Sequence, residues 1–491
     1  MKRSNWILAG ILILAVSLRI LAITTRDIQY DDAFTILLSS RTLGEIISGT
    51  AADTMPPLFY FLLHFWGLIA KKIWFYRLLS ILFNLGTVIG VYILSRSISQ
   101  KAAFWSAFLF DISPMQIYHA QDIRMYSFLE FCLIWYLFFT YKYYFTENID
   151  NSRIWYGLGI VATGTAAMYT HNIAVFIIIM PNLSLLVLRK WRPLLDLILK
   201  QVIIFTLFLP WIFQLPGQIN KVNQAFWTPV PGLLQVVQTV IMWHASLPLP
   251  WKITALVAAI SILLFVLVLY TFMRSTIQKP QKLYLILACT IPPITLFAVS
   301  YIMRPLFVPR VFIASQALYL VVAGIAISST RVRWIRFAIA GLFIVASALS
   351  LPYQVTYSEF PRSPHKVAST QLEKLDMTDT IIVHNSKLSY FPFVVHSPGL
   401  NQTYISDEPG SFNDTLATET QAALDLPAAD DIQSAVDEYQ KVIFVTYSEV
   451  FKEYLDAGKS HPEMDWLESN YLLVDEKKYN DLHLFTFILR D

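Results

Sequence analysis

The sequence predicts an α-helical membrane protein with many spans, followed by a small soluble α/β domain. Its 491 residues are 56% hydrophobic and only 14% charged, and the mean hydropathy is +0.52. These values lie far outside the range of ordinary soluble domains. Apolar runs recur as far as residue 351, after which the composition becomes mixed and acidic. We therefore expect a transmembrane domain at residues 1–351 and an extracytoplasmic α/β domain at residues 352–491.

The apolar runs predict about 11 transmembrane helices. A helix needs about 20 apolar residues to cross a bilayer. Runs of suitable length lie near residues 5–23, 77–95, 101–118, 125–145, 154–170, 173–188, 194–215, 251–273, 283–303, 311–328 and 334–351. The first run follows Met1-Lys2-Arg3 and lacks a convincing cleavage site, so we interpret it as an uncleaved signal anchor. This places the N-terminus in the cytoplasm.

The segment at residues 55–70 is apolar but short, and it decides the orientation of every later loop. Basic residues favour the cytoplasmic side of a membrane. If the segment lies on the outer surface, nearly every basic cluster faces inward: Arg96/Lys101, Lys142/Arg153, Arg189/Lys190/Arg192, Arg274/Lys279/Lys282 and Arg331/Arg333/Arg336. We therefore predict an interfacial helix here. Lys71 and Lys72 are then a basic pair on the outer side, and the C-terminal domain is also outside.

Two other regions carry structural predictions. The connection at residues 216–250 contains Trp227, Pro229 and Trp243, and the periodicity of its second half predicts an interfacial helix. It is either a lid or a surface loop set in the headgroups. In the C-terminal domain, buried strands are expected at residues 380–385 and 442–446, helices at 367–375, 432–439 and 449–457, and a hairpin from 472–474 and 484–489.

Acidic residues at the membrane rim are the first candidates for catalysis. Asp27, Asp31 and Asp32 directly follow the first apolar run. Asp31 and Asp32 could simply cap the next helix, and Asp27 we interpret as a surface charge. A further carboxylate, Asp122, lies in a second outer connection. Two outer loops thus each supply a carboxylate, which suits a general base with an orienting or metal-binding partner.

Outer basic residues are candidates for binding an anion. Arg124 lies two residues from Asp122, and Arg310 lies in a proline-bounded connection between two spans. Planar guanidinium groups bind phosphate through paired hydrogen bonds. Arg19 and Arg304 we interpret instead as arginines that extend to the membrane surface. His64 and His171 are further candidates, although an interfacial aromatic and a polar helix end account for them equally well.

Several chemistries are excluded. The sequence has no Cys/His cluster with zinc spacing, no phosphate-binding glycine-rich loop and no Gly-x-Ser-x-Gly motif. Its two cysteines lie inside apolar runs and do not indicate a disulfide framework. The basic residues form short orientation clusters, so no nucleic-acid partner is expected.

The order of several short motifs resembles the GT-C membrane glycosyltransferases. The motifs are Tyr30-Asp31-Asp32-Ala33, Met55-Pro56-Pro57, Arg77-Leu78-Leu79-Ser80, Ser113-Pro114, the run at residues 118–126, and Pro309-Arg310-Val311-Phe312. The resemblance is to the family-39-related branch, with the protein O-mannosyltransferases and the aminoarabinose transferases of lipid A. It covers roughly residues 5–330 and does not extend beyond residue 352.

The resemblance implies an inverting transfer of a monosaccharide from a polyprenyl-phosphate donor to a lipid, glycan or protein acceptor. Asp31 would be the base, with Asp32 beside it and Asp122 as the second-loop acid. Arg124, Arg310 and Lys71 or Lys72 would hold the donor phosphate. Relatives differ in whether they use a divalent metal, so a metal at Asp31 and Asp122 stays open. Asp32 stands where many relatives have Glu, and Phe312 where they have an aromatic hydroxyl.

Two other functions remain as alternatives. A lipid-linked glycan transporter without transferase chemistry would carry charges at several depths of a central cavity, whereas the strong charges here lie near one face. An O-antigen ligase or polymerase would need a large basic outer loop, which residues 216–250 do not supply. We therefore expect a multi-pass glycosyltransferase of the plasma membrane that contacts membrane lipids.

Overall fold

The computed structural model describes residues 2–21, 23–146, 152–224, 228, 230–302, 306–356, 363–408 and 414–490. Arg304, Trp227 and Pro229 lie outside the described residues. The chain divides into two compact units. The first, here called the membrane unit, comprises Met1–Ile23 and Thr54–Phe360, and the second, the sheet unit, comprises Thr24–Asp53 and Pro361–Asp491. The sheet unit thus takes in a segment that directly follows the first apolar run, and the boundary at residues 351/352 stays a prediction.

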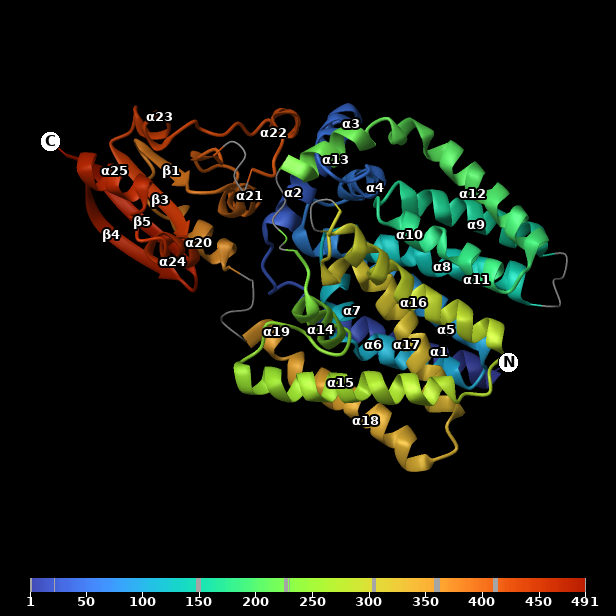
Figure 1. Ribbon diagram of the computed structural model, residues 1–491. Coiled ribbons are helices and arrows are strands. Elements are labelled where there is room, and N and C mark those ends of the chain that lie inside the picture. Colours follow the sequence, from blue (N-terminus) through green and yellow to red (C-terminus); the bar gives the residue numbers. More distant parts are fainter. Residues whose placement is uncertain are drawn as a thin grey trace. The chain divides into compact units, whose positions relative to one another are not determined.

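The membrane unit is built from helices (Figure 1). They are α1 (Lys2–Ile20), α4 (Leu58–Gly67), α5 (Ile73–Ile98), α6 (Ala102–Ile112), α7 (Pro114–Ala120), α8 (Tyr126–Phe145), α9 (Arg153–Met168), α10 (Ala174–Ile178), α11 (Met180–Val187), α12 (Trp191–Ile212), α13 (Leu215–Gln224), α14 (Leu233–Met242), α15 (Trp251–Met273), α16 (Lys279–Val299), the 3₁₀ helix η1 (Pro309–Phe312), α17 (Ile313–Ser329), α18 (Arg333–Ser350) and α19 (Tyr353–Thr356). Helix α17 is buried along almost its whole length. A Cβ at Gly324 would lie 2.6 Å from the backbone nitrogen of Ser106, so this glycine lets α17 approach α6 closely.

Within the described residues, six helices are long and apolar enough to cross a membrane: Ile73–Ile98, Trp191–Ile212, Trp251–Met273, Lys279–Val299, Pro309–Ser329 and Arg333–Thr356. The chain is a multi-pass membrane protein, but the expected count of eleven spans is not confirmed. One expected span, at residues 101–118, is divided into α6 and α7. Ser113 is extended, with φ −66° and ψ 122°, because the residue before a proline avoids the helical region. The expected span at residues 173–188 is likewise divided, into α10 and α11.

The short apolar segment at residues 55–70 forms only a ten-residue helix, α4. A helix rises 1.5 Å per residue, so α4 reaches about 15 Å, half the hydrocarbon thickness of about 30 Å. Helix α4 is thus too short to cross a bilayer by itself, whereas its place at the outer interface stays a prediction. In the connection at residues 216–250, the expected helix is α14, and α13 is a helix that the sequence did not predict.

A buried polar network runs through the membrane unit and corrects the interpretation of Arg19. Its guanidinium is fully buried and does not reach the surface. Arg19 Nε donates to Asn84 Oδ1 at 2.5 Å, and Nη1 lies 3.9 Å from Asp111 Oδ1. Gln116 Nε2 donates to Glu130 Oε1 at 2.7 Å and to Gln316 Oε1 at 2.8 Å. Polar residues inside the apolar runs thus replace water as hydrogen-bonding partners for the arginine.

The sheet unit is a small α/β domain. Its elements are α2 (Tyr30–Ser39), α3 (Leu43–Ala52), α20 (His365–Leu372), β1 (Thr380–His384), α21 (Lys387–His396), β2 (Gln402–Tyr404), α22 (Thr418–Leu424), α23 (Ile432–Val436), β3 (Lys441–Tyr447), α24 (Ser448–Asp456), α25 (Pro462–Asn470), β4 (Tyr471–Tyr479) and β5 (Leu482–Leu489). The strand order is β2-β1-β3-β5-β4. β1 pairs in parallel with β2 and β3, whereas β5 is antiparallel to β3 and β4. The expected strands, helices and closing hairpin are confirmed.

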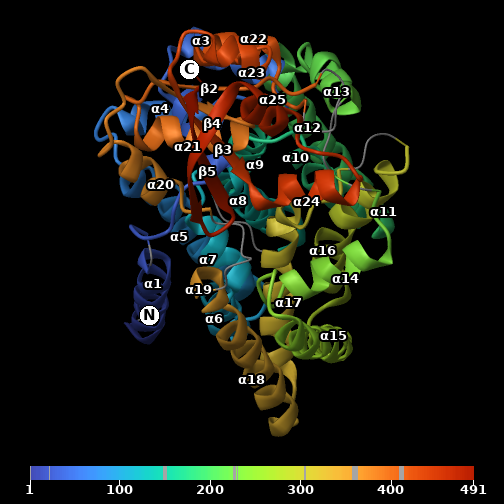
Figure 2. The same ribbon diagram turned by 90° about the vertical axis from the view of Figure 1, so that its left-hand side faces the viewer.

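Helices cover both faces of this sheet (Figure 2). On one face, Val442, Phe444 and Phe485 pack with side chains of α23 and α25. On the other, Ile443, Val445 and Leu484 pack with side chains of α20 and α21. Because successive side chains alternate between the two faces and helices cover both, β3 and β5 carry apolar side chains on both faces.

Candidate functional site

The last turn of α7 and its connection to α8, which the sequence predicts to face the outer side, hold a histidine and carboxylate pair. His119 Nδ1 lies 2.7 Å from Asp122 Oδ2, across the end of the short helix α7. Both residues are buried, and Ser127 Oγ donates to the carbonyl of His119 at 3.0 Å. Pro114 begins α7, where a missing amide proton costs nothing. The break before Pro114 therefore sets the short helix that presents Asp122.

Residues from two other connections gather beside this pair. The ring centroid of Tyr126 lies 5.5 Å from that of His119 and 6.4 Å from that of His171. The Arg310 guanidinium carbon lies 5.8 Å from the centre of the Tyr126 ring. We call this group, which comprises His119, Asp122, Arg124, His171 and Arg310 around Tyr126, the outer polar cluster. Three segments far apart in sequence thus contribute to one site.

His171 is the buried, neutral histidine of this cluster. It lies in the connection between α9 and α10 and is 5% exposed. Burial, followed by the charges of Arg124 and Arg310, lowers the pKa of its imidazole to about 3. The histidine therefore stays neutral at physiological pH, while the two arginines stay charged. The cluster pairs one carboxylate with two guanidinium groups, a composition suited to binding an anion.

The remaining basic candidates of the membrane unit lie on α4 and directly after it. His64 is half-buried and packs edge-on against Phe65, with ring centroids 5.3 Å apart. Lys71 and Lys72 are exposed, and Lys72 is the residue that precedes α5. Among the described residues, neither lysine takes part in a hydrogen bond or ion pair that would fix its side chain. Asn172 Nδ2, next to His171, donates to the carbonyl of Thr54 at 3.0 Å.

The acidic pair Asp31-Asp32 belongs to the first turn of α2 in the sheet unit. Asp32 is buried, and its Oδ2 accepts from the Gln29 amide at 3.5 Å, as in a capping box. The simple capping role therefore accounts for Asp32. Asp31 is half-buried, and its carbonyl accepts from Thr35 Oγ1 at 2.8 Å.

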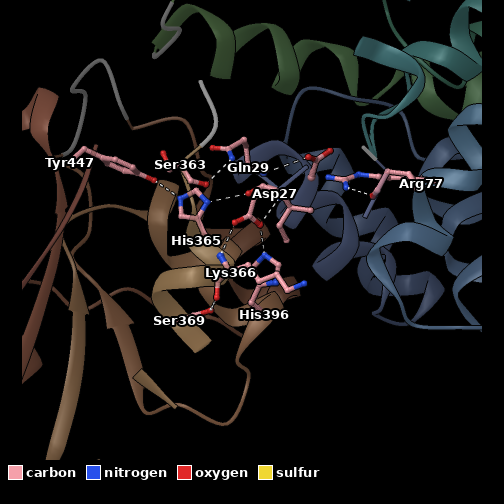
Figure 3. Close-up of polar contacts among 12 residues, drawn as sticks. Asp27, Gln29, Arg77, Ser363, His365, Lys366, Ser369, His396 and Tyr447 are labelled. Carbon is pink, nitrogen blue, oxygen red and sulfur yellow. Dashed lines mark hydrogen bonds and ion pairs between the residues drawn. The ribbon is translucent and has the colours of Figure 1, made fainter. Parts of the chain in front are cut away.

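Asp27 is not the plain surface charge expected from the sequence. Its Oδ1 lies 2.7 Å from His396 Nε2, and its Oδ2 accepts from the Lys366 amide at 2.7 Å (Figure 3). Burial raises the pKa of Asp27, but the hydrogen bond and charge of His396 and the Lys366 amide outweigh it and lower the pKa. These partners could not be predicted from the residues around Asp27, because they lie more than 300 residues later in the chain.

His365 completes the anchoring of this acidic segment. His365 Nδ1 donates to the Ile28 carbonyl at 3.1 Å, and Nε2 accepts from Tyr447 Oη at 3.0 Å (Figure 3). Farther along, the Tyr30 ring stacks on Phe391 with centroids 5.4 Å apart. The chain from residue 27 to the first turn of α2 is thus held by α20 and α21, which positions Asp31.

The sequence leaves open whether Asp31 and Asp122 hold a metal ion. Within the described parts of the chain, no three His, Cys, Asp or Glu side chains gather as ligands of a metal ion would. Divalent cations bound by oxygen require several such ligands or waters. The reaction proposed below therefore includes no metal-dependent step.

Comparison with known proteins rests on structure. No family model matches the sequence, and no curated protein matches it. The crystal structure of ArnT from Cupriavidus metallidurans bound to undecaprenyl phosphate is similar, with a TM-score of 0.65 and 13% identity over 98% of each chain.

The oligosaccharyltransferase of Archaeoglobus fulgidus is similar as well. Its structure tethered with an acceptor peptide has a TM-score of 0.57 and 13% identity, over 99% of this chain and 74% of that one. Its complex with an inhibitory peptide and a dolichol-phosphate has a TM-score of 0.54 and 15% identity, over 98% and 74%. Both neighbours are GT-C proteins. The chain therefore has the GT-C membrane fold that its motif order predicted.

Proposed function

We propose that the chain is a glycosyltransferase that moves a monosaccharide from a polyprenyl-phosphate donor to an acceptor hydroxyl, with inversion at the anomeric carbon. The observation that carries the proposal is the outer polar cluster, in which Asp122 and Arg124 of one connection gather with Arg310 of another in a GT-C fold. The structural neighbours were solved with undecaprenyl phosphate and with dolichol-phosphate. A phosphate carried by a lipid is the ligand that this charge pattern suits.

Arg124 and Arg310 are assigned to the donor phosphate. As the bond from the anomeric carbon to the phosphate oxygen breaks, negative charge grows on the leaving phosphate. Guanidinium groups stabilise that charge more in the transition state than in the ground state, which accelerates the reaction. Lys71 and Lys72, which are exposed in the connection after α4, are assigned to the same phosphate. His171 is neutral at physiological pH, so it lies near the two arginines without adding a further positive charge.

Asp31 is assigned as the general base. It takes the proton of the acceptor hydroxyl while the acceptor oxygen attacks the anomeric carbon from the side opposite the phosphate. The result is one new glycosidic bond, one free polyprenyl phosphate and an inverted anomeric centre. Asp32 caps α2, the helix whose first turn carries Asp31, and Asp122 is assigned as the second acid.

The acceptor is a hydroxyl group of a lipid, glycan or protein at the outer face of the plasma membrane. We propose a cytoplasmic N-terminus and an extracytoplasmic sheet unit, in agreement with the distribution of basic loops. The donor arrives within the bilayer, so no soluble nucleotide has to be bound.

A transporter of lipid-linked glycans is the alternative, and product analysis separates the two. The full-length protein is placed in liposomes with a polyprenyl-phosphate sugar labelled in the sugar, and with candidate acceptors. A transferase releases unlabelled polyprenyl phosphate and joins the label to the acceptor, whereas a transporter leaves the donor intact. Arg310→Gln is expected to abolish release, and Arg274→Gln, which changes an exposed arginine elsewhere in the unit, to preserve it. Intact donor at all times would overturn the proposal.

A further inference from the structure

A serine, a histidine and a glutamate form a hydrogen-bonded chain in the sheet unit, where the proposed transfer uses none of them. Ser448 Oγ lies 2.8 Å from His483 Nε2. On the other side of the ring, His483 Nδ1 lies 3.0 Å from Glu476 Oε1. With the proton on Nδ1, the ring donates to Glu476 and accepts the hydroxyl proton of Ser448. This is the order of contacts in a nucleophile, base and orienting acid.

The fold brings these residues together for a clear reason. β3 ends at Tyr447, and Ser448 is the first residue of α24, so the serine occupies a strand-to-helix junction. His483 on β5 pairs with Thr446 on β3 and with Lys478 on β4. Glu476 pairs with Phe485, two residues beyond His483 and therefore on the same face. The three groups belong to three elements, so their alignment is a tertiary feature.

The site is open to a small molecule. Ser448 and His483 line a depression of about 380 Å³ together with Phe451, Met464 and Phe485. The His483 side chain is 13% exposed and that of Glu476 is 50% exposed. Phe451 packs edge-on against the His483 ring, with centroids 5.8 Å apart, which restrains the imidazole. Charged groups of Glu476 and Lys478 complete the rim.

We propose that the sheet unit carries a second active site, in which Ser448, His483 and Glu476 hydrolyse carboxylic esters with a short acyl group. The apolar side chains of Phe451, Met464 and Phe485 fit a short acyl chain, and the charged rim fits a polar alcohol. This activity is separate from the proposed sugar transfer and does not depend on it.

The reaction balances with water as the only co-reactant. Ser448 Oγ forms a bond to the ester carbonyl carbon and gives its proton to His483 Nε2. The bond from that carbon to the alkoxy oxygen breaks, and the alcohol leaves with the proton. Water then attacks the acyl-serine, His483 takes a proton from it, and the acid departs as Ser448 recovers its hydrogen.

The junction also offers a group for the oxyanion. First-turn amides of a helix have no acceptor within the helix. The Ser448 amide donates to the Asp481 carbonyl at 2.7 Å, and the Glu449 amide follows it in the first turn. The amide after the nucleophile serves this role in other strand-nucleophile-helix junctions. This junction differs from those in having Thr446 and Val450 where they carry glycines, which explains why no motif marked it.

The test uses the full-length protein in detergent and a fluorophosphonate probe, which reacts with activated serines. The wild type is expected to be labelled at Ser448, as located by mass spectrometry, and to lose p-nitrophenyl butyrate hydrolysis in proportion to labelling. Ser448→Ala and His483→Gln are expected to lower kcat/KM for the ester at least about 100-fold. Glu476→Gln is expected to lower kcat more than it raises KM, since this group only orients the base. Ser469→Ala, at an exposed serine on α25, serves as the matched control.

Two results would overturn the proposal. One is a wild-type protein that the probe does not label at Ser448, which requires no variant to fold. The other is ester hydrolysis that persists unchanged in Ser448→Ala. Sugar transfer by Ser448→Ala is measured in parallel and is expected to match the wild type, so the two activities are judged separately.

Discussion

His119 Nδ1 lies 2.7 Å from Asp122 Oδ2, and this contact holds the carboxylate within the outer polar cluster. The two residues are three positions apart across the end of α7, so the pair is formed by one short segment. Arg124 and Arg310 supply the positive charge of the same cluster.

Asp122→Asn should lower kcat/KM for sugar transfer at least about 100-fold, because the amide keeps the shape of the side chain but loses its charge. The measurement is release of polyprenyl phosphate by the purified protein. Asp196→Asn is the matched control, since Asp196 forms an ion pair with Lys200 elsewhere in the membrane unit. Equal rates for Asp122→Asn and the wild type would remove Asp122 from the catalytic machinery.

Arg310→Lys and Arg124→Lys should each raise KM for the lipid-linked donor about tenfold or more. Lysine keeps the charge but loses the paired donors that match a phosphate, and a hydrogen bond to a charged group contributes about 1.5–3 kcal/mol. Donor titration at saturating acceptor measures the effect, with Arg274→Lys as the control. A donor KM that stays at the wild-type value in both variants would contradict the assignment.

The sheet unit should lose stability as the pH falls from about 6.5 to about 4. Burial lowers the pKa of His365 from 6.5 to about 4, so the unfolded chain binds more protons in that window and is favoured. The lowered pKa of His365 contributes on the order of 3 kcal/mol to the free energy of unfolding at neutral pH. Hydrogen exchange of the full-length protein across this pH range measures this loss of stability as a loss of protection in β1 and β3.

His365→Gln should make that loss of protection shallower between pH 6.5 and 4, although the variant also loses part of the contact to Tyr447. Below that window Asp27 becomes important. Its lowered pKa contributes stability above the unfolded value of 3.8, and this is lost as the pH falls through the folded value. If protection falls with pH in parallel in His365→Gln and the wild type, His365 does not cause the loss of stability in this pH range.

Arg19→Met should destabilise the membrane unit by about 3–5 kcal/mol, because it leaves the buried carboxyl of Asp111 without its arginine. Unfolding in detergent micelles measures the change, and Arg192→Met, at an exposed arginine, is the control. The double variant Arg19→Met with Asp111→Leu should recover part of the loss. A single variant as stable as the wild type would mean that the network does not hold these helices together.

Much of the architecture could be predicted because its signals are local. The composition change after residue 351 predicts a soluble domain, and the apolar runs near residues 380–385 and 442–446 predict β1 and β3. The shortness of the apolar run at residues 55–70 likewise predicts the short helix α4. The motif order predicted the GT-C fold.

The errors arise where distant residues decide the outcome. The burial of Arg19 could not be predicted from its neighbours in sequence, because its partners Asn84 and Asp111 come from other helices. Asp27 is held by Lys366 and His396, far along the chain, so its neighbours in sequence gave no sign of its ion pair. The division of the expected spans at residues 101–118 and 173–188 has a local cause instead, because Pro114 and Pro181 lie within these apolar runs.

The assignment of Asp31 as the base is tested with purified wild type, Asp31→Asn and the control variant Asp437→Asn, which changes an exposed aspartate of the same unit. The three proteins are compared at equal expression in release of polyprenyl phosphate, and the anomeric configuration of the product is determined by NMR. We expect an inverted product from the wild type and from Asp437→Asn, and a loss of at least about 100-fold in kcat for Asp31→Asn. Near wild-type kcat in Asp31→Asn, or a product with retained configuration, would contradict this assignment.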